Sequence, residues 1–184
     1  MEFSELITNR RSVRAYTGEL LTRTQAEPIL DAGLRAPNAC NLQSWHFYAL
    51  IGADAAELLF PEVYSAPWFE KIGMAVVATV DDAALRERFG EEKGISFGIQ
   101  DIGAAMENMA LAAADAGFGS CWIGAFDPDA CRRKVGIPRK RRPVAILAIG
   151  RPDGEPALRD RKPKEEKVTY ICSGRDFDSV YSHA

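Results

Sequence analysis

Hydrophobic and polar positions alternate between helical and extended patterns along the chain. The apolar residues between residues 3 and 10 recur at helical spacing, which predicts a short first helix with Ser4 as its cap. The apolar positions of residues 26–34 predict a second helix, with Thr24 and Glu27 as a capping box. The N-terminal part of the chain therefore indicates two helices.

Extended patterns dominate the middle of the chain. Residues 74–80 form a continuous apolar run bounded by glycine and aspartate, which is typical of a central strand covered on both faces. Shorter patterns predict further strands at residues 46–51, 120–123 and 144–149. We therefore expect a sheet with a fully buried central strand.

Two more helices are predicted in the second half. Residues 99–116 are apolar nearly all round, as in a helix enclosed by other elements, and Gly117 is expected to end it. Asp127 is a helix cap followed by proline, and Gly136 follows the last helical position, so a short basic helix is expected at residues 128–135.

Length and composition narrow the class of protein. The 184 residues suit one domain, and 47% hydrophobic with 27% charged residues excludes a disordered chain. A net charge of −3 leaves no overall basic field for nucleic acid. No apolar stretch reaches the ~20 residues that span a membrane, and the acidic start does not resemble a secretory signal. We expect a cytoplasmic protein without nucleic-acid or membrane partners.

Several common kinds of site are not indicated. No Gly-x-Gly-x-x-Gly turn follows a strand, and no phosphate-binding Gly-Lys-Ser/Thr loop exists. His46 and His183 are the only histidines, and neither is a persuasive general base. The four cysteines match neither a zinc site nor a Cys-x-x-Cys redox pair. We expect no metal site, and mostly structural thiols.

Two polar segments could carry chemistry. Residues 10–14 hold three arginines and one serine, which could bracket a phosphate, and residues 37–45 hold three side-chain amides that could bind a heterocycle edge. Taken alone, the arginine segment is better explained as a solvated charge cluster, and residues 37–45 are better explained as an ordinary turn.

Together these segments resemble the nitroreductase family of FMN-dependent oxidoreductases. Residues 10–14 read Arg-Arg-Ser-Val-Arg and residues 36–45 read Ala-Pro-Asn-Ala-Cys-Asn-Leu-Gln-Ser-Trp, with Asn38 where the family usually has serine and Ser44 where it usually has proline. The resemblance continues, in family order, through residues 101–113, 117–126 and 148–152.

The resemblance implies a fold and an assembly. It implies an α+β fold with a central, mainly antiparallel sheet flanked by helices. It also implies a homodimer with two FMN sites in its interface. Residues 1–150 would form the FMN-binding core of a single domain. Residues 151–184 would form a C-terminal arm that wraps the partner subunit and completes its sheet.

The resemblance also implies a set of cofactor-binding residues. Those that would hold the FMN phosphate and ribityl chain are Arg10, Arg11, Ser12 and Arg14, with Arg159 and Arg161 closing on the phosphate. Those that would approach the flavin from the other subunit are Pro37, Asn38, Ala39 and Asn41. Those that would run beside the flavin ring are Ile123, Gly124 and Ala125.

The implied activity is hydride transfer from NADH or NADPH, through flavin N5, to a nitroaromatic, quinone or similar small-molecule acceptor by a ping-pong mechanism. No catalytic side chain is needed. Arg14 would stabilise negative charge near N1 and O2, and the Gly124 backbone would lie at N5. Two alternatives stay open: a non-catalytic FMN-binding or redox-sensing protein, and a reactive thiol at Cys40 or Cys121.

Overall fold

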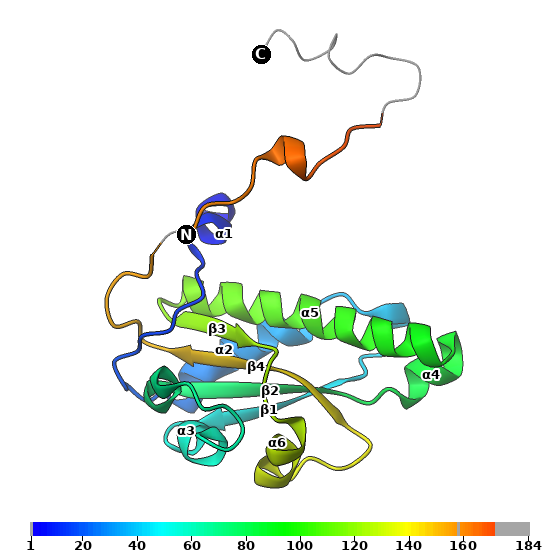
Figure 1. Ribbon diagram of the computed structural model, residues 1–184, viewed down its shortest axis with the longest axis horizontal. Coiled ribbons are helices and arrows are strands. Elements are labelled where there is room, and N and C mark those ends of the chain that lie inside the picture. The colour runs from blue at the N-terminus through cyan, green and yellow to red at the C-terminus, as the bar shows by residue number, and fades with distance from the viewer. Residues whose placement is uncertain (1, 158, 172–184) are drawn as a thin grey trace, which may run out of the picture.

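The centre of the molecule is an antiparallel sheet. The computed structural model describes residues 2–157 and 159–171. Its four strands lie in the order β1-β2-β4-β3, and every neighbouring pair is antiparallel (Figure 1). They are β1 (Trp45–Ile51), β2 (Met74–Val80), β3 (Gly119–Ile123) and β4 (Arg142–Gly150). The expected α+β class with its antiparallel sheet is confirmed.

Helices cover both faces of the sheet. Those that the described residues form are α1 (Phe3–Asn9), α2 (Arg23–Leu34), α3 (Asp54–Leu59), α4 (Ala83–Phe89), α5 (Glu91–Asp115) and α6 (Pro128–Val135). Helices α2 and α5 pack on one face, and α3 and α6 pack on the other (Figure 1). The sheet is therefore the middle of three layers.

Strand β2 belongs to both hydrophobic cores. Val76 and Ala78 pack in the core beneath α2 and α5, whereas Ala75 and Val77 pack in the core above α3 and α6. All seven residues of β2 are buried. Each fully buried valine stabilises the fold by roughly 1.5–3 kcal/mol relative to an exposed one. The strand predicted as covered on both faces is confirmed.

Helix α5 begins eight residues earlier than predicted. Two glycines, Gly94 and Gly98, lie in this added part of the helix, and both allow close packing. A Cβ at Gly94 would lie 2.7 Å from the Arg86 backbone nitrogen, and one at Gly98 would lie 2.9 Å from a Val80 methyl. The gain from close packing against α4 and β2 outweighs the cost of about 1 kcal/mol for each helical glycine. The predicted stop is confirmed: Gly117 has φ +79° and follows the helix.

The predicted caps of the first two helices are wrong. The capping box of α2 is Thr22 with Gln25, whose side chain accepts from the Thr22 N–H at 2.9 Å. Glu27 is instead ion-paired with Arg23 at 2.9 Å, one turn into the helix. Ser4 lies inside α1, which has no side-chain cap. In α2 two threonines, Thr22 and Thr24, fit a capping pattern, whereas α1 begins one residue before Ser4.

The caps of α6 are as predicted. The Asp127 carboxylate accepts from the N–H groups of Asp129 and Ala130, both at 2.9 Å, and Gly136 adopts a left-handed conformation with φ +74°. Here the local sequence alone sets both ends of the helix.

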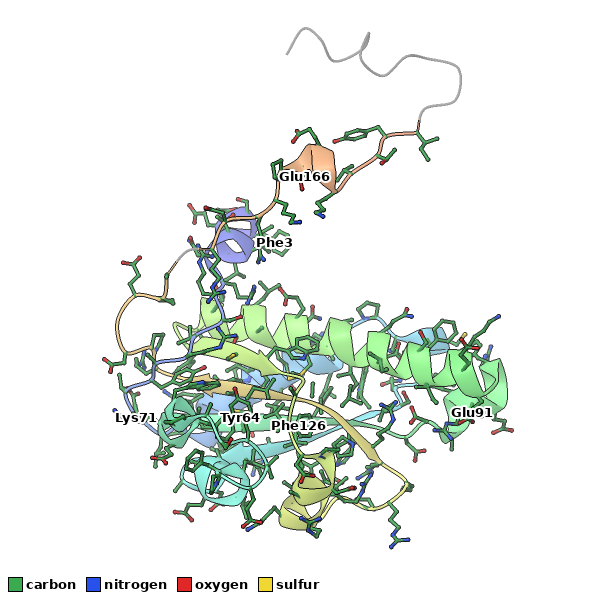
Figure 2. The ribbon with its side chains drawn as sticks, in the orientation of Figure 1. Phe3, Tyr64, Lys71, Glu91, Phe126 and Glu166 are labelled. Atoms are coloured by element: carbon green, nitrogen blue, oxygen red, sulfur yellow. The ribbon has the colours of Figure 1, made fainter. Side chains whose placement is uncertain are left out.

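Residues 15–17 pair with residues 151–153 beside the sheet. The Thr17 N–H donates to the Arg151 carbonyl, and the Asp153 N–H donates to the Ala15 carbonyl, both at 3.0 Å. We call this pairing of residues 15–17 with residues 151–153 the clasp. Beyond it, α1 and the C-terminal extension lie away from the sheet, as Phe3 and Glu166 mark (Figure 2). The part of the predicted arm at residues 172–184 lies outside the described residues, so partner wrapping stays a prediction.

Candidate functional site

The N-terminal arginine segment runs along the outer edge of β3. The Val13 N–H donates to the Ser120 carbonyl at 2.9 Å, and Ser12 forms a parallel bridge with Ser120. The Val13 side chain is buried, whereas Ser12 and Arg14 are exposed. This alternation along an extended backbone turns the polar side chains toward solvent.

Two contacts that the sequence did not predict fix this segment. The buried Tyr16 hydroxyl donates to the Val13 carbonyl at 2.9 Å. A Cβ at Gly119 would lie 2.5 Å from a Val13 methyl, so only glycine lets the segment approach β3 this closely. In the sequence, these two contacts are marked only by a tyrosine after the arginines and a glycine at the start of a strand. Neither signal reveals its partner before the fold is known.

The arginine segment and the C-terminal extension line one cavity of about 570 Å³. We call it the arginine cavity, and its lining residues are Ile7, Thr8, Arg10, Arg11, Ser12, Arg14, Ala157, Arg159, Asp160 and Arg161. The fold therefore brings together the two predicted basic segments, which lie 145 positions apart between Arg14 and Arg159.

The arginines of the cavity differ in how far they are already engaged. Arg10 lies 3.5 Å from the Glu107 carboxylate. The Arg11 guanidinium donates to the carbonyls of Thr8 and Arg10, which caps the end of α1. The three exposed arginines at positions 14, 159 and 161 have no hydrogen-bond or ion-pair partner among residues 2–157 and 159–171. They are therefore the guanidiniums available to an anion.

The Arg14 charge affects the pKa of the Cys121 thiol, but this thiol is not activated. Burial raises the pKa of Cys121, and Arg14 opposes this shift only in part. The side chain is 2% exposed. A buried thiol with a raised pKa is a poor nucleophile, which argues against the reactive-thiol alternative at this position.

The predicted amide residues lie elsewhere within the chain. Pro37, Asn38, Ala39 and Asn41 belong to the connection between α2 and β1 and do not line the arginine cavity. We call residues 37–43 the amide loop. Within one chain, the structure does not bring this loop and the arginines together.

The amide loop is held mainly by its own atoms. The Asn38 side-chain oxygen accepts from the Gln43 N–H at 2.8 Å, and the Leu42 N–H donates to the Ala39 carbonyl at 3.0 Å. Asn38 stands where the resembled family usually has serine, and its amide oxygen is used inside the loop. One external bond runs from the Ala39 N–H to the buried Asp101 carboxylate on α5, at 2.9 Å.

The third predicted segment continues the edge on which the arginines lie. Ile123 is the buried last residue of β3, and Gly124 and Ala125 follow it as exposed residues. A Cβ at Gly124 would meet nothing closer than the Trp122 indole nitrogen at 4.0 Å, so the backbone here is open to approach. Ile123 lies three positions after Ser120 along the strand, a distance of about 10 Å. One elongated ligand could lie along this edge from the arginines to Gly124.

Other site chemistry is not indicated in the described part of the chain. Residues 2–157 and 159–171 contain no group of three metal-ligating side chains. None of their helices is long and apolar enough to cross a membrane. His46 is exposed, with its ring edge-on to Tyr48 at 4.8 Å between ring centroids. Partial burial and the nearby Arg141 charge both lower the pKa of His46. His183 lies outside the described residues.

The chain is similar to known proteins over most of its length. The model of the Nitroreductase family matches residues 7–151. A protein of Methanothermobacter thermautotrophicus, whose name gives NADH dehydrogenase and NAD(P)H nitroreductase, is 29% identical over 164 residues, covering 87% of this chain and 82% of the relative. An FMN reductase (NADPH) of Bacillus subtilis is 25% identical over 190 residues, covering 94% and 76%. A nitroreductase family protein of Streptococcus pneumoniae shares the fold, with a TM-score of 0.83, 20% identity and coverage of 92% and 100%.

Proposed function

The chain belongs to the nitroreductase family, and we propose that it is an oxidoreductase that binds FMN and takes electrons from NADH or NADPH for a small-molecule acceptor. The names of the relatives, FMN reductase (NADPH) and NADPH-dependent oxidoreductase, support this chemistry. The observation that carries the proposal is the convergence of two distant basic segments on one cavity.

The three unpaired arginines fit the phosphate of FMN. Arginine presents a planar fork of donors that binds phosphate oxygens in pairs, and Arg14, Arg159 and Arg161 carry no competing partner among the described residues. Arg10 and Arg11 have carboxylate or carbonyl partners of their own. We therefore assign the phosphate chiefly to the first three, with Arg10, Arg11 and Ser12 framing the cavity.

The edge of β3 and the exposed backbone at Gly124 would hold the ring. FMN bound here would supply the redox chemistry, which we propose to be hydride transfer from a nicotinamide at N5 and electron transfer to an acceptor in a ping-pong cycle. The chain's residues bind and orient: Arg14 holds positive charge beside the ring, and Gly124 leaves its backbone exposed. No side-chain acid or base takes part.

A second copy of the chain would complete the site. Helix α1 buries none of its residues, and Phe3 and Ile7 are exposed, as are Tyr170 and Ile171 on the extension. Exposed apolar side chains on both terminal segments favour a homodimer. Such a dimer would bring the amide loop of the partner, with its Pro37, Asn38, Ala39 and Asn41, to the flavin.

Spectroscopy of the purified protein tests the cofactor and the activity. We expect noncovalent FMN at about one per chain, bleached by anaerobic NADH or NADPH and restored by a quinone or nitroaromatic acceptor. A colourless protein that ignores added FMN contradicts the proposal. FMN that is reduced slowly and shows no acceptor-dependent oxidation favours the non-catalytic alternative.

A truncation tests the arm separately from the phosphate site. Removing residues 164–184 leaves Arg159, Arg161 and the clasp in place. If the arm wraps the partner, the truncated chain should dissociate at higher concentration and retain FMN less well, because binding only to the dimer stabilises the dimer. A truncated chain that stays dimeric and yellow contradicts the arm's assignment.

A further inference from the structure

Asp101 is a buried charge in the middle of the longest helix. It is 5% exposed, and it is the only charged residue among the buried positions of α5. Burying a carboxylate is unfavourable unless hydrogen bonds compensate for the lost water. Burial accordingly raises the pKa of Asp101, and the bond from Ala39 opposes this shift in part. A contact that Asp101 makes in the folded protein must therefore offset the free-energy cost of burying its carboxylate.

The Asp101 carboxylate binds the backbone of the amide loop. One oxygen accepts from the Ala39 N–H at 2.9 Å, and the other is buried with no hydrogen-bond partner. Among the described residues, this bond is the one polar contact between the amide loop and another element. The loop's orientation relative to α5 therefore depends on Asp101 and on the apolar contacts of Ala39 and Leu42 with the core.

The loop needs such an anchor because its backbone is strained. Cys40, Asn41 and Gln43 have φ values of 50°, 54° and 47°, in the left-handed region that residues with a side chain rarely adopt. The internal bond from Gln43 to Asn38 holds the far end of the loop. The bond to Asp101 holds the near end, immediately before Cys40.

We propose that Asp101 is a positioning residue that, through the Ala39 N–H, fixes the amide loop in the conformation that meets the flavin of the partner subunit. This inference rests on the proposed FMN function. Asp101 itself touches no cofactor, and its effect passes through the loop backbone.

Two substitutions of nearly equal shape separate the hydrogen bond from packing. Asp101→Asn keeps an acceptor for the Ala39 N–H, whereas Asp101→Leu keeps the branched skeleton, with larger methyl groups, but removes the acceptor. We expect Asp101→Leu to weaken FMN binding about tenfold and Asp101→Asn to stay close to wild type. Asp82→Asn is the matched control, because Asp82 is also buried, at 7% exposed, but pairs with Arg142 rather than with the loop. It should leave FMN affinity unchanged.

A second readout reports on the loop without FMN. Cys40 is exposed, whereas Cys121 and Cys131 are buried, so in a Cys172→Ser background a thiol reagent should label Cys40 first. We expect Asp101→Leu, but not Asp101→Asn, to change the Cys40 labelling rate several-fold, because the released loop leaves its left-handed conformation.

The two readouts keep this inference apart from the cofactor proposal. If wild-type protein binds no FMN, the cofactor proposal fails, and Cys40 labelling still decides whether Asp101 holds the loop. If FMN binds but Asp101→Leu matches wild type in affinity and labelling, the positioning role is overturned. The role is equally overturned if Asp101→Asn is as impaired as Asp101→Leu, because the acceptor would then not be what matters.

Discussion

The arginine cavity and the amide loop are built in opposite ways. The cavity gathers exposed guanidiniums from two ends of the chain, and Arg14, Arg159 and Arg161 have no partners among the described residues. The amide loop is seven consecutive residues, bonded to itself and to one buried carboxylate. The difference teaches that the cavity contributes charged side chains that no bond within the described residues holds in place, whereas the loop contributes a fixed backbone shape. The first should govern affinity for an anion, and the second should govern the geometry around a planar ring.

The largest effect is expected from removing an unpaired charge. Arg14→Ala should weaken FMN binding by roughly tenfold to a hundredfold, because a charge-assisted hydrogen bond contributes about 1.5–3 kcal/mol. Arg10→Ala should weaken FMN binding less than Arg14→Ala does, since Arg10 already lies beside Glu107. Titration of each variant with FMN checks the ranking. As a control, Cys121→Ser should bind FMN as wild type does. Equal losses of FMN affinity in Arg14→Ala and Arg10→Ala would contradict the distinction between free and engaged guanidiniums.

The next effect tests whether the cavity has any fixed shape at all. Gly119→Ala would place a methyl group 2.5 Å from Val13, which forces the arginine segment off β3. Overpacking of this kind costs about 1–3 kcal/mol of stability and should also lower FMN affinity. Thermal unfolding and FMN titration measure the two effects. Gly103→Ala is the control, because its methyl group would meet only the Trp122 ring edge at 4.0 Å.

A smaller effect is expected inside the amide loop. Asn38→Ala removes the acceptor for the Gln43 N–H and should cost about 1 kcal/mol of loop stability. Its effect on FMN affinity should be nearly independent of salt, whereas the loss caused by Arg14→Ala should shrink as salt screens the exposed charges. FMN titrations at low and high ionic strength distinguish the two. A strongly salt-dependent loss in Asn38→Ala would contradict the contrast between the regions.

The smallest effect concerns pH and the buried carboxyl. Because the pKa of Asp101 is raised in the folded protein above its ordinary value of 3.8, its ionisation opposes folding. Its stabilising contribution is complete below pH 3.8 and is lost as pH rises through the folded-state pKa. Asp101→Asn should therefore gain stability relative to wild type at neutral pH and lose that advantage below pH 3.8. Thermal unfolding at both pH values measures the difference, and an equal difference at both would be contrary to this expectation.

Sequence patterns predicted the elements whose causes are local. The apolar run of β2 and the caps of α6 lie where expected, because burial on both faces and side-chain capping are written in adjacent residues. The start of α5 was missed, because Gly94 is favourable there only against α4, which the helical pattern of 99–116 does not include. Prediction from sequence fails where a residue is favourable in a helix only because of the element that packs against it.

The candidate site shows the same limit. The arginines at positions 10–14 were recognised from their motif, but their meeting with Arg159 came from a family resemblance and not from spacing. Asp101 gave only a weak signal, because it is one of three acidic residues, with Glu107 and Asp115, in the apolar helix predicted at residues 99–116. Its partner Ala39 lies 62 positions away, and no local pattern connects the two.

The clasp shortens the length of free chain that joins the two basic segments. Because Tyr16 already pairs with Pro152, Arg14 lies two residues from one side of that bridge and Arg159 seven residues from the other. An anion that binds both therefore closes a short loop of chain instead of one of 145 residues. The entropy of closing a loop grows with the logarithm of its length, so most of it is already spent when the sheet forms. Each arginine thus meets the other at the high effective concentration of a tethered group.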